Sequence, residues 1–420
     1  MRVLVVAPYC NPSHTSEPLL AFNQCRALSR LLPRLQIATY DFNKAAIERD
    51  GSLWARIWYV PRHITQLKTL YRILPPFPGR SHVFRSLTHY YFEKSLWKLH
   101  RSEAEMRRFD VIHRITPVSS AIPSPLTAWS STPMVIKPVN GGLPFPTAFR
   151  LAMHREKDFA RYIRSAWNLF PYSRATYKNA AAVLAAFDHT ISRLPRFARD
   201  RAINAPENGA DPDRFKEARI SELTPPFTFL FVGRLVPFKC ADILIKALAE
   251  SDILRRHRLV IVGDGPERSG LERMVSDHGL SGSVTFRGNL PQPRVAEEMS
   301  RAMAFVFPSI RDSGAGVVVE AMMAGLPVVA VGYGPVLDLL TEDTGIQIPL
   351  GHEQSHIAGF RSAMETLVAD PKAGAAMGRR AAVRARALFD WDVRARKLVE
   401  TYEWALGRRD RPPDFYQADI

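Results

Sequence analysis

Short apolar runs recur along the second half of the chain, and segments with helical periodicity separate them. The runs occupy 227–232, 259–262, 283–286, 304–307, 326–331 and 345–348. Strands that alternate with helices form βαβ units, whose parallel sheet is covered by helices on both faces. The pattern therefore predicts an α/β fold with a doubly wound parallel sheet in this half.

The first half repeats the pattern less regularly, with apolar runs at 3–7, 35–40, 109–112, 134–136 and 181–186. A chain of 420 residues is too long for one core, because hydrophobic cores stop growing at about 250 to 300 residues. We therefore predict two Rossmann-like domains, at 1–205 and 227–389, joined by a linker at 206–226 that is rich in turn formers. An amphipathic helix at about 390–420 is predicted to join the first domain.

Composition is that of an ordinary globular protein, with 46% hydrophobic and 23% charged residues. The three cysteines, Cys10, Cys25 and Cys240, have no CxxC spacing, which fits a reducing cytoplasm. The first apolar run ends at Pro8, before the roughly 7 to 15 residues of a signal-peptide core, and no run reaches the roughly 18 residues of a membrane span. We expect a cytoplasmic protein.

The formal net charge of +16 is uneven, and basic residues are interleaved with aromatic ones between 51 and 105. This combination suits docking on anionic lipid headgroups or a nucleic-acid groove, while a solvated helical face with an aromatic seam explains it equally well. The chain has no nucleic-acid motif, so we expect no nucleic-acid partner. A peripheral contact with the cytoplasmic membrane face is the functional alternative to the solvated face.

The first candidate motif follows the apolar run at 227–232. Gly233 permits a tight turn at the carboxyl edge of the sheet, where parallel sheets bind ligands. Arg234 and Lys239 lie on the loop and at the entry to the next helix, where they can hold a diphosphate. Taken alone, two such residues are more often surface charges.

The second motif runs from Arg311 to Gly325. Gly314, Ala315 and Gly316 open a helix whose free amides form an anion site. Glu320 lies one helical turn after Gly316 and can accept hydrogen bonds from a diol such as ribose. Asp312 can do the same for a sugar, or it can simply cap the helix.

These motifs together resemble the retaining GT-B glycosyltransferases of the family that includes bacterial mannosyltransferases and sucrose synthases. The resemblance is carried by Gly233-Arg234 with Lys239, Val262-Gly263-Asp264-Gly265-Pro266, Val284-Thr285-Phe286-Arg287-Gly288, Pro308-Ser309, Asp312 with Glu320, Gly325-Leu326-Pro327-Val328, and the linker Pro206-Glu207-Asn208-Gly209-Ala210-Asp211. It covers the second half well and the first half weakly. It implies two domains that face each other across a cleft, with the acceptor on the first and the nucleotide-sugar donor on the second.

The resemblance also implies roles for individual residues. Arg234 and Lys239 would bind the donor diphosphate, Glu320 the ribose, and Asp312 a hydroxyl of the transferred sugar, with Arg287 in the donor site. The family has Glu where this chain has Asp312, which is shorter by one methylene. The implied reaction retains the anomeric configuration and needs no metal ion and no cofactor, since the nucleotide sugar is a substrate. The implied acceptor is a glycan or a lipid-linked sugar, as in polysaccharide biosynthesis.

Three further patterns have structural explanations. Asp211-Pro212-Asp213 spells the metal-binding Asp-x-Asp of another glycosyltransferase architecture, but capping of a short helix is favoured in a turn-rich linker. His113 ends an expected strand and is a weak cleft candidate, with a structural role favoured. Asn140 and Gly141 form either a loop close to the acceptor or a tight turn, and the turn is favoured.

Two other functions compete with sugar transfer. Hydride transfer from a dinucleotide is disfavoured, because Pro8-Tyr9-Cys10-Asn11-Pro12 follows the first strand in place of the G-x-G-x-x-G turn. A non-catalytic basic protein that binds a sugar nucleotide or a polyanion would have the same fold. Release of nucleoside diphosphate distinguishes an enzyme from such a binding protein.

Overall fold

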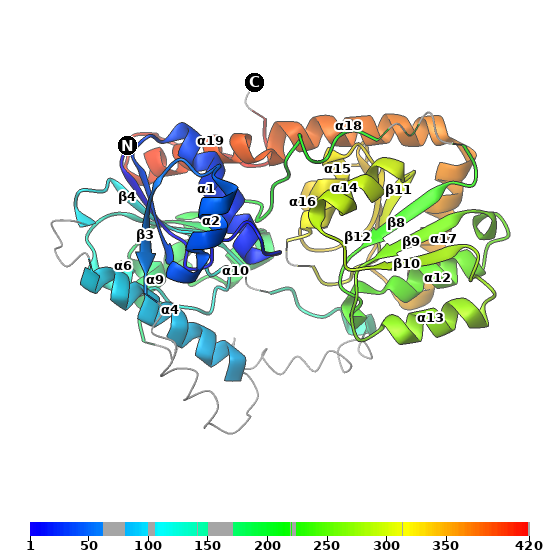
Figure 1. Cartoon of the computed structure of the whole chain (residues 1–420), viewed down its shortest axis with the longest axis horizontal. Helices are drawn as coiled ribbons and strands as arrows, with labels where there is room; N and C mark the ends of the chain where they lie inside the picture. Colours follow the sequence, from blue (N-terminus) through cyan, green and yellow to red (C-terminus); the bar gives the residue numbers. More distant parts are fainter. Residues whose placement is uncertain are drawn as a thin grey trace. The chain divides into compact units, whose positions relative to one another are not determined.

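The computed structural model describes residues 1–61, 80–99, 106–140, 142–149, 171–218, 220, 224–312 and 314–418. Contacts divide these residues into two compact units. Unit 1 takes in the described residues of 1–142, 158–207 and 391–419, and unit 2 takes in those of 143–157 and 208–390. Each unit has its own parallel sheet with helices around it (Figure 1).

Unit 1 is built on a seven-stranded sheet in the order β3-β2-β1-β4-β5-β6-β7. All of its strand pairs are parallel. The strand order reverses direction between β1 and β4, which makes this the topological switch point of the unit. The strands are β1 (Val3–Val6), β2 (Leu35–Tyr40), β3 (Arg56–Val60), β4 (Val111–Arg114), β5 (Met134–Val139), β6 (Ala180–Ala185) and β7 (Ala202–Asn204).

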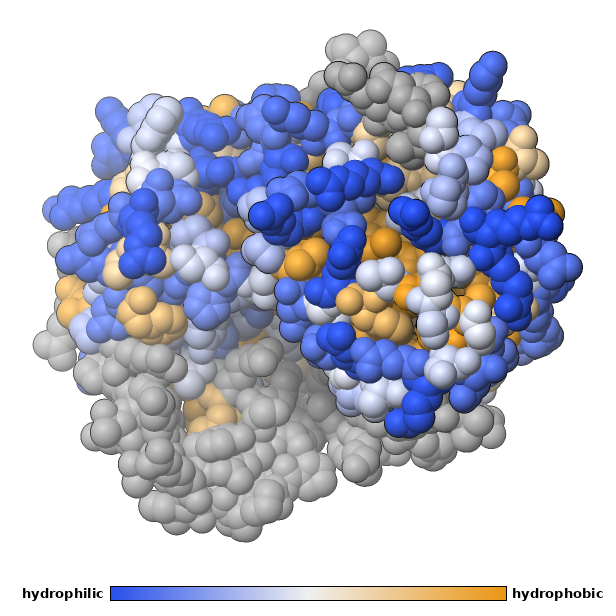
Figure 2. All heavy atoms as spheres, turned by 45° about the vertical axis from the view of Figure 1, so that its right-hand side comes forward, coloured by the Kyte–Doolittle hydropathy of each residue, from blue (hydrophilic) through white to orange (hydrophobic). Residues whose placement is uncertain are grey.

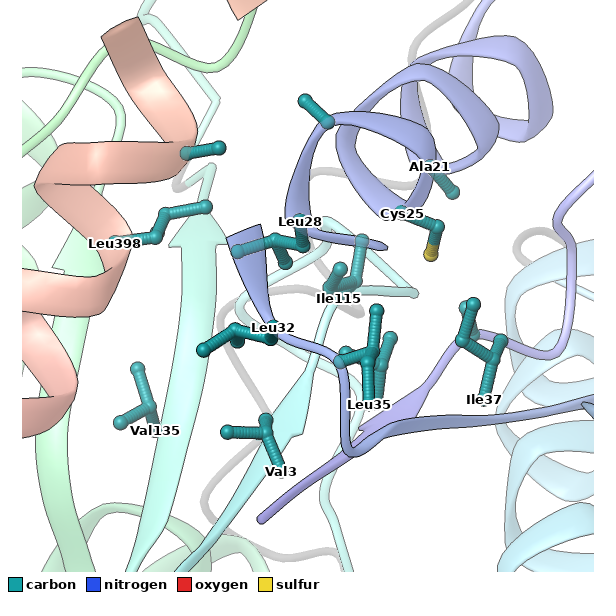
Figure 3. Close-up of a cluster of buried hydrophobic side chains, with 14 of the residues drawn as sticks. Val3, Ala21, Cys25, Leu28, Leu32, Leu35, Ile37, Ile115, Val135 and Leu398 are labelled. Carbon is teal, nitrogen blue, oxygen red and sulfur yellow. The ribbon is translucent and has the colours of Figure 1, made fainter. Parts of the chain in front are cut away.

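Helices cover both faces of this sheet, because successive apolar side chains of β1 point to opposite faces and all of them are buried. Val3 and Val5 point into a core that α1 and α19 close, while Leu4 and Val6 point into a second core on the opposite face. Figure 3 shows the first core, where Leu28 and Cys25 of α1 face Val3 and Leu35 of the strands. The helices of unit 1 are α1 (Glu17–Leu31), α2 (Lys44–Asp50), α4 (Arg80–Leu99), α6 (Leu126–Trp129), α9 (Ser173–Lys178), α10 (Asp188–Arg193), α11 (Arg196–Arg199) and α19 (Trp391–Ala405), with short 3-10 helices η1 (Asp41–Asn43) and η2 (Thr147–Phe149), the latter in unit 2.

The C-terminal helix α19 packs against α1 in unit 1. Leu398 and Tyr402 are buried in the core beneath it. At the surface, Nη1 of Arg30 on α1 lies 3.0 Å from Oδ2 of Asp392 on α19. The last helix is thus held to the first unit by apolar burial and by a half-exposed ion pair.

Unit 2 is built on a six-stranded sheet in the order β10-β9-β8-β11-β12-β13. The strands are again parallel, and the switch point lies between β8 and β11. Helices α12, α13 and α17 cover one face, and α14, α15, α16 and α18 cover the other (Figure 1). The elements are β8 (Thr228–Val232), β9 (Arg258–Val262), β10 (Val284–Gly288), β11 (Ala304–Phe307), β12 (Val328–Gly332), β13 (Gly345–Pro349), α12 (Ala241–Ala249), α13 (Arg268–Asp277), α14 (Gln292–Arg301), α15 (Gly316–Met323), α16 (Val336–Leu339), α17 (Glu353–Ala369) and α18 (Pro371–Phe389), with η5 (Pro237–Lys239) and η6 (Leu254–Arg256).

Every apolar run that predicted a strand overlaps a strand of the structure, so the doubly wound α/β prediction is confirmed for both halves. Two strands were not predicted. In β3, the exposed or half-buried residues from Arg56 to Tyr59 give no continuous apolar run, because the strand lies at the sheet edge. The other, β7, has only three residues.

A segment of the first half packs in unit 2. The described residues 143–149 belong there by contact, although the sequence predicted that residues 1–205 form one domain. Leu143 and Phe149 are buried in unit 2, where the ring centroid of Phe149 lies 5.1 Å from that of His356. The segment Leu143-Pro144-Phe145-Pro146 has neither helical nor strand periodicity, so no pattern indicated where it would pack.

On the face drawn in Figure 2, the described surface is mostly hydrophilic, with apolar patches between hydrophilic residues. Among the described helices, none is long and apolar enough to cross a membrane. The three cysteines are buried and unpaired as disulfides. The part of the basic aromatic segment 51–105 that comprises 62–79 and 100–105 lies outside the described residues.

Candidate functional site

The polar residues of both motifs lie beyond the carboxyl ends of β8 and β11, the two strands that flank the switch point of unit 2. Gly233 and Arg234 follow β8, and Asp312 lies on the loop between β11 and α15. Ligands of doubly wound sheets bind in the crevice outside the strand ends at such a point. The fold therefore brings together residues from two separate motifs at the expected edge.

Glycines lock the loop after β8 onto the loop after β9. The Gly233 amide donates to the Val262 carbonyl at 3.0 Å, and the Leu235 amide donates to the Asp264 carbonyl at 2.9 Å. A Cβ atom on Gly263, which has φ +130°, would lie 1.9 Å from the Gly233 carbonyl oxygen. Only glycine allows the two backbones to approach this closely. The position of Arg234 is therefore fixed by backbone contacts.

Lys239 and Asp312 form an ion pair across the switch point. The Lys239 ammonium also lies 4.5 Å from the ring centroid of Phe307, on the last residue of β11. The two side chains are only 11% and 19% exposed, so solvent screens the pair little. The amine is thus held over an aromatic ring between the two loops.

Asp312 also caps the helix that follows it. Its Oδ1 atom accepts hydrogen bonds from the amides of Gly314 and Ala315, at 3.1 and 2.8 Å. Burial by itself would raise the pKa of Asp312, but the Lys239 charge and these hydrogen bonds outweigh burial and lower it. Asp312 is therefore an anion in this structure, and the capping that the sequence offered as an alternative is present. Ser313 lies outside the described residues.

Ala315 and Cys240 precede α15 and α12 with φ angles of 45° and 49°. This left-handed conformation is uncommon for residues with a side chain and persists where the surrounding structure imposes it. The other non-glycine residues with positive φ in the described chain, Ser16 and Tyr172, also stand immediately before helices. The two in unit 2 set the direction in which the first amides of α12 and α15 point.

Glu320 lies one turn into α15 and is half-buried. Its Oε1 atom accepts a hydrogen bond from Gln292 Nε2 at 2.7 Å, and Arg214 in turn donates to the Gln292 side-chain oxygen. Burial raises the pKa of Glu320 to about 7, against the lowering effects of Gln292 and Arg214. Glu320 is therefore poised to change its charge near neutral pH.

Gly316, the first residue of α15, lies against Asn208. A Cβ atom at this position would be 2.9 Å from the Asn208 side-chain carbon, so the helix start has room only for glycine. Since the first amides of a helix have no partner within the helix, this end can receive an anion. Glu320 and the helix start lie on the same face of α15.

Arg234 and Arg287 occupy different environments. Arg234 is exposed, and its guanidinium has no ion-pair partner in the described part of the chain. Arg287 lies on β10, the edge strand of unit 2, where its Nε atom is 3.3 Å from Oε1 of Glu298. Arg287 is separated from β8 by one strand, whereas Arg234 directly follows β8.

Residues 143–146 lie over the loops that follow β11 and β12 in unit 2. The Nε atom of Arg311 donates to the Leu143 carbonyl at 2.8 Å, and the Arg311 guanidinium lies 4.7 Å from the ring centroid of Phe145. The Tyr333 hydroxyl donates to the Pro144 carbonyl at 2.9 Å. The side chain of Arg311, the first residue of the second motif, is thus engaged in contacts with this segment.

In unit 1, His113 is completely buried. Its Nδ1 atom lies 2.6 Å from the Tyr402 hydroxyl of α19, and burial lowers its pKa to about 3, with the nearby Lys137 charge adding to the effect. His113 lies one residue before the end of β4, and its burial agrees with the structural role that the sequence favoured over the cleft. His113 pairs in register with Val5 and Val135 and shares their face of the sheet, beneath the C-terminal helix.

Asn140 forms the tight turn that the sequence favoured. Its side-chain oxygen accepts a hydrogen bond from the Gly142 amide at 2.9 Å, and its side-chain nitrogen donates to Glu207 at 3.1 Å. Gly142 has φ +70°, as such a turn requires. Gly141 lies outside the described residues.

Asp211 caps a turn. Its Oδ1 atom accepts a hydrogen bond from the Asp213 amide at 3.0 Å. The sequence favoured capping of a short helix by Asp211-Pro212-Asp213, and the segment that is capped is a turn. No group of three potential ligands among His, Cys, Asp and Glu comes together in the described residues.

Sequence reasoning missed Gln292, Arg214 and Asn208, which contact Glu320 or the start of α15. Gln292 opens α14 directly after Pro291, at the carboxyl side of β10. Its place after a parallel strand was the available signal, because residues there share one edge of the sheet. Arg214 and Asn208 lie in the linker, where spacing alone does not indicate a partner.

Residues 213–384 match a family described as "Glycosyl transferases group 1". A GDP-mannose-dependent alpha-(1-6)-phosphatidylinositol monomannoside mannosyltransferase of Mycolicibacterium smegmatis is 32% identical over 270 residues, which is 58% of this chain and 68% of that protein. A D-inositol 3-phosphate glycosyltransferase of Streptomyces avermitilis is 31% identical over 42% of this chain and 39% of its own length. The chain thus matches only about two fifths of the length of the Streptomyces protein.

Two solved structures share the fold over nearly the whole chain. Sucrose-phosphate synthase from Thermosynechococcus elongatus aligns with a TM-score of 0.69 at 18% identity, over 97% of this chain and 100% of that one. The Anabaena protein HepE in complex with UDP and glucose aligns with a TM-score of 0.63 at 17% identity, over 96% and 100%. At these identities the likeness concerns the fold.

Proposed function

Because this chain belongs to the glycosyl transferases of group 1, we propose that it transfers a sugar from a nucleotide-sugar donor to a glycan or a lipid-linked acceptor. We propose further that transfer retains the anomeric configuration and requires no metal ion. Unit 2 binds the donor in this scheme. The similar mannosyltransferase uses GDP-mannose according to its name, and HepE was solved with UDP.

The observation that carries the proposal is the convergence of Arg234, Lys239 and the start of α15 at the switch point of unit 2. A nucleoside diphosphate is an anion whose oxygens accept hydrogen bonds from helix amides and cations. Glu320, on the same helix, accepts hydrogen bonds from the two hydroxyls of the ribose. The site thus offers separate partners for the diphosphate and the nucleoside.

In this reaction the bond between the anomeric carbon and the diphosphate oxygen breaks, and negative charge accumulates on the leaving oxygen. Arg234 and Lys239 stabilise this charge more in the transition state than in the ground state, because it is fully developed only on departure. Lys239 is held by Phe307 and by Asp312, so its ammonium is already in place before the donor binds.

Asp312 has a second part in the proposal. Its carboxylate binds Lys239 and the helix amides of Gly314 and Ala315, and a sugar hydroxyl becomes a further hydrogen-bond donor to it. A carboxylate has about four acceptor sites, so these contacts are compatible. Asp312 would then couple the position of the sugar to that of the lysine.

The test is incubation of the full chain with UDP, GDP, ADP and TDP sugars and candidate glycan or lipid-linked acceptors, with released nucleoside diphosphate as the readout. Acceptor-dependent release with one donor supports the proposal. Tight donor binding without release across the acceptor panel would favour the alternative, a non-catalytic sugar-nucleotide binding protein. The anomeric proton coupling of the product, measured by NMR, decides between retention and inversion.

Metal independence is tested in the same assay. Activity that persists in excess chelator supports it, because Arg234 and Lys239 then supply the positive charge at the diphosphate. Loss of activity that Mg²⁺ or Mn²⁺ restores would contradict it.

A cytoplasmic location with peripheral contact to an anionic membrane is part of the proposal. Trp54 and Tyr91, in the described parts of 51–105, are 69% and 41% exposed and are suited to the interface of a bilayer. Tyr90, another aromatic residue of α4, instead packs within unit 1, where its ring lies against those of Trp129 and Tyr172. Co-sedimentation with anionic liposomes at low salt supports the contact, and its absence would contradict it.

A further inference from the structure

Four arginines surround a cavity at the amino-terminal edge of the unit 1 sheet. The cavity has a volume of about 590 Å³, and its lining includes Arg2, Arg34, Arg56 and Arg108. This edge is opposite to the carboxyl edge, where doubly wound sheets bind their substrates. The cavity is therefore separate from every residue assigned above to the donor or acceptor.

The arginines come from adjacent strands. Arg56 begins β3, Arg34 precedes β2, Arg2 precedes β1, and Arg108 lies shortly before β4. The sheet order is β3-β2-β1-β4, so each of four neighbouring strands brings one arginine to the same edge. With neighbouring strands about 4.8 Å apart, the row extends over roughly 14 Å.

These guanidinium groups have no carboxylate partner in the described part of the chain. Other half-exposed arginines do have such a partner, as Arg30 has in Asp392 and Arg361 in Glu250. Asp110, close to Arg108 in the sequence, accepts a hydrogen bond from the Arg2 backbone amide and lies 4.0 Å from Arg408. A row of like charges repels itself, so binding of an anion with several charges is favourable.

The walls of the cavity suit a small ligand. Trp58 and Phe109 line one part, with ring centroids 5.7 Å apart and the planes at 68°. Gln36 lines another part, and its side-chain oxygen is buried without a hydrogen-bond partner among the described residues. Such a buried polar atom requires a partner. A ligand hydroxyl can donate to it, and rotation of the amide presents its NH₂ group to an anion instead.

We propose that this cavity binds a ligand that carries several phosphate groups in a row. Arginine matches the geometry of phosphate with paired hydrogen bonds, and the volume is that of a small-molecule site. The phosphate groups belong either to a soluble oligophosphate or to a phosphorylated lipid headgroup. The proposal is independent of the sugar-transfer reaction.

The test measures binding by the full chain of inorganic tripolyphosphate, by calorimetry, and of phosphatidylcholine vesicles with and without a phosphatidylinositol bisphosphate, by co-sedimentation. The variant is Arg34→Gln with Arg56→Gln, two exposed positions whose replacement leaves the core intact. The matched control is Arg49→Gln with Arg196→Gln, which removes the same charge from exposed positions of unit 1 outside the cavity. Thermal unfolding of both variants verifies folding.

We expect the cavity variant to bind at least about tenfold more weakly than wild type, and the control variant to bind within about twofold of it. Weaker binding of tripolyphosphate by the cavity variant identifies a soluble ligand, and weakening confined to the vesicles that contain the phosphatidylinositol bisphosphate identifies a lipid headgroup. No binding of either probe by wild type would overturn the proposal. Equal weakening in the cavity and control variants would also overturn it, since the effect would then be one of net charge.

Discussion

Units 1 and 2 have the same strand order around their switch points, yet they place charged residues differently along the strands. In unit 1, Arg114 and Lys137 lie within β4 and β5 and are buried. In unit 2, Arg234, Lys239 and Asp312 lie beyond the ends of β8 and β11, on loops. The same topology thus has charges inside the sheet in one unit and at its edge in the other.

The position of a charge relative to the strand end decides what it can contact. A side chain within a buried strand points at the covering helices, so Arg114 pairs with Glu93 of α4, with Nε 3.1 Å from Oε1. Burial also lowers the pKa of Lys137, although the charges of Glu207 and Glu17 act to raise it. A residue beyond the strand end stays accessible to a ligand. Charge inside the sheet is therefore committed to contacts within the fold, whereas charge at the edge is placed where a ligand can reach it.

The largest effect is expected from Glu93→Gln in unit 1. The variant leaves the Arg114 guanidinium buried without its counter-ion, and breaking a buried pair in this way costs about 3 to 5 kcal/mol of unfolding free energy. Denaturant unfolding measures the loss. The control is Glu250→Gln in unit 2, which breaks the half-exposed pair with Arg361 and should cost less than about 1 kcal/mol. Equal losses of unfolding free energy in the two variants would remove the distinction between buried and exposed ion pairs.

Arg234→Ala should leave the unfolding transition unchanged, because Arg234 is exposed. It should lower kcat/KM about 10²- to 10³-fold, since a cation at the leaving group acts in the transition state. Arg294→Ala on α14, another exposed arginine of unit 2, serves as the control and should retain activity. Near-normal turnover by Arg234→Ala would mean that the edge charge of unit 2 is not functional.

Glu320 connects the edge site to pH. Its pKa of about 7 means that the carboxylate loses its proton as pH rises through neutrality, and only the ionised form accepts hydrogen bonds with both oxygens. Donor affinity should therefore rise roughly tenfold from pH 6 to pH 8. In Glu320→Gln the KM for the donor should be higher than in wild type and should not depend on pH over this interval. A pH dependence that persists in the variant would assign the titration to another group.

The smallest effect is expected from Arg287→Ala. Sequence resemblance placed Arg287 in the donor site, but it lies on the edge strand and pairs with Glu298. Because Arg287 is engaged by Glu298 and is one strand removed from β8, the KM for the donor should change less than about threefold. A change as large as that of Arg234→Ala would extend the donor site to β10.

Much of this architecture follows from local sequence. Apolar runs predict strands because both faces of a parallel sheet are buried, and Gly233 and Gly263 are found where two backbones meet at close range. Lys239 and Asp312 each follow a predicted strand, which indicated that both lie at the same edge of one sheet. The structure brings them together as an ion pair.

Other features depend on contacts that no local pattern encodes. Register against Val5 and Val135 turns His113 toward α19, and its partner Tyr402 is 289 residues away in the chain. The hydrogen bond between Gln292 and Glu320 likewise joins two separate helices, across 28 residues of the chain. The cavity of four arginines requires the strand order itself, since Arg56 and Arg108 are near each other only through the sheet.

The packing of 143–149 in unit 2 limits how freely the two halves can be exchanged with those of relatives. Cutting at 208 and 390 would transplant the unit 2 sheet without Leu143, whose Cδ1 atom lies 2.3 Å from the place of a Cβ atom on Gly334. It would also leave Arg311 and Tyr333 without the carbonyls of Leu143 and Pro144. A chimera keeps the grafted unit intact only if residues 143–149 are transferred with it. The residues that build unit 2 are therefore discontinuous along the gene, although they are contiguous in the folded chain.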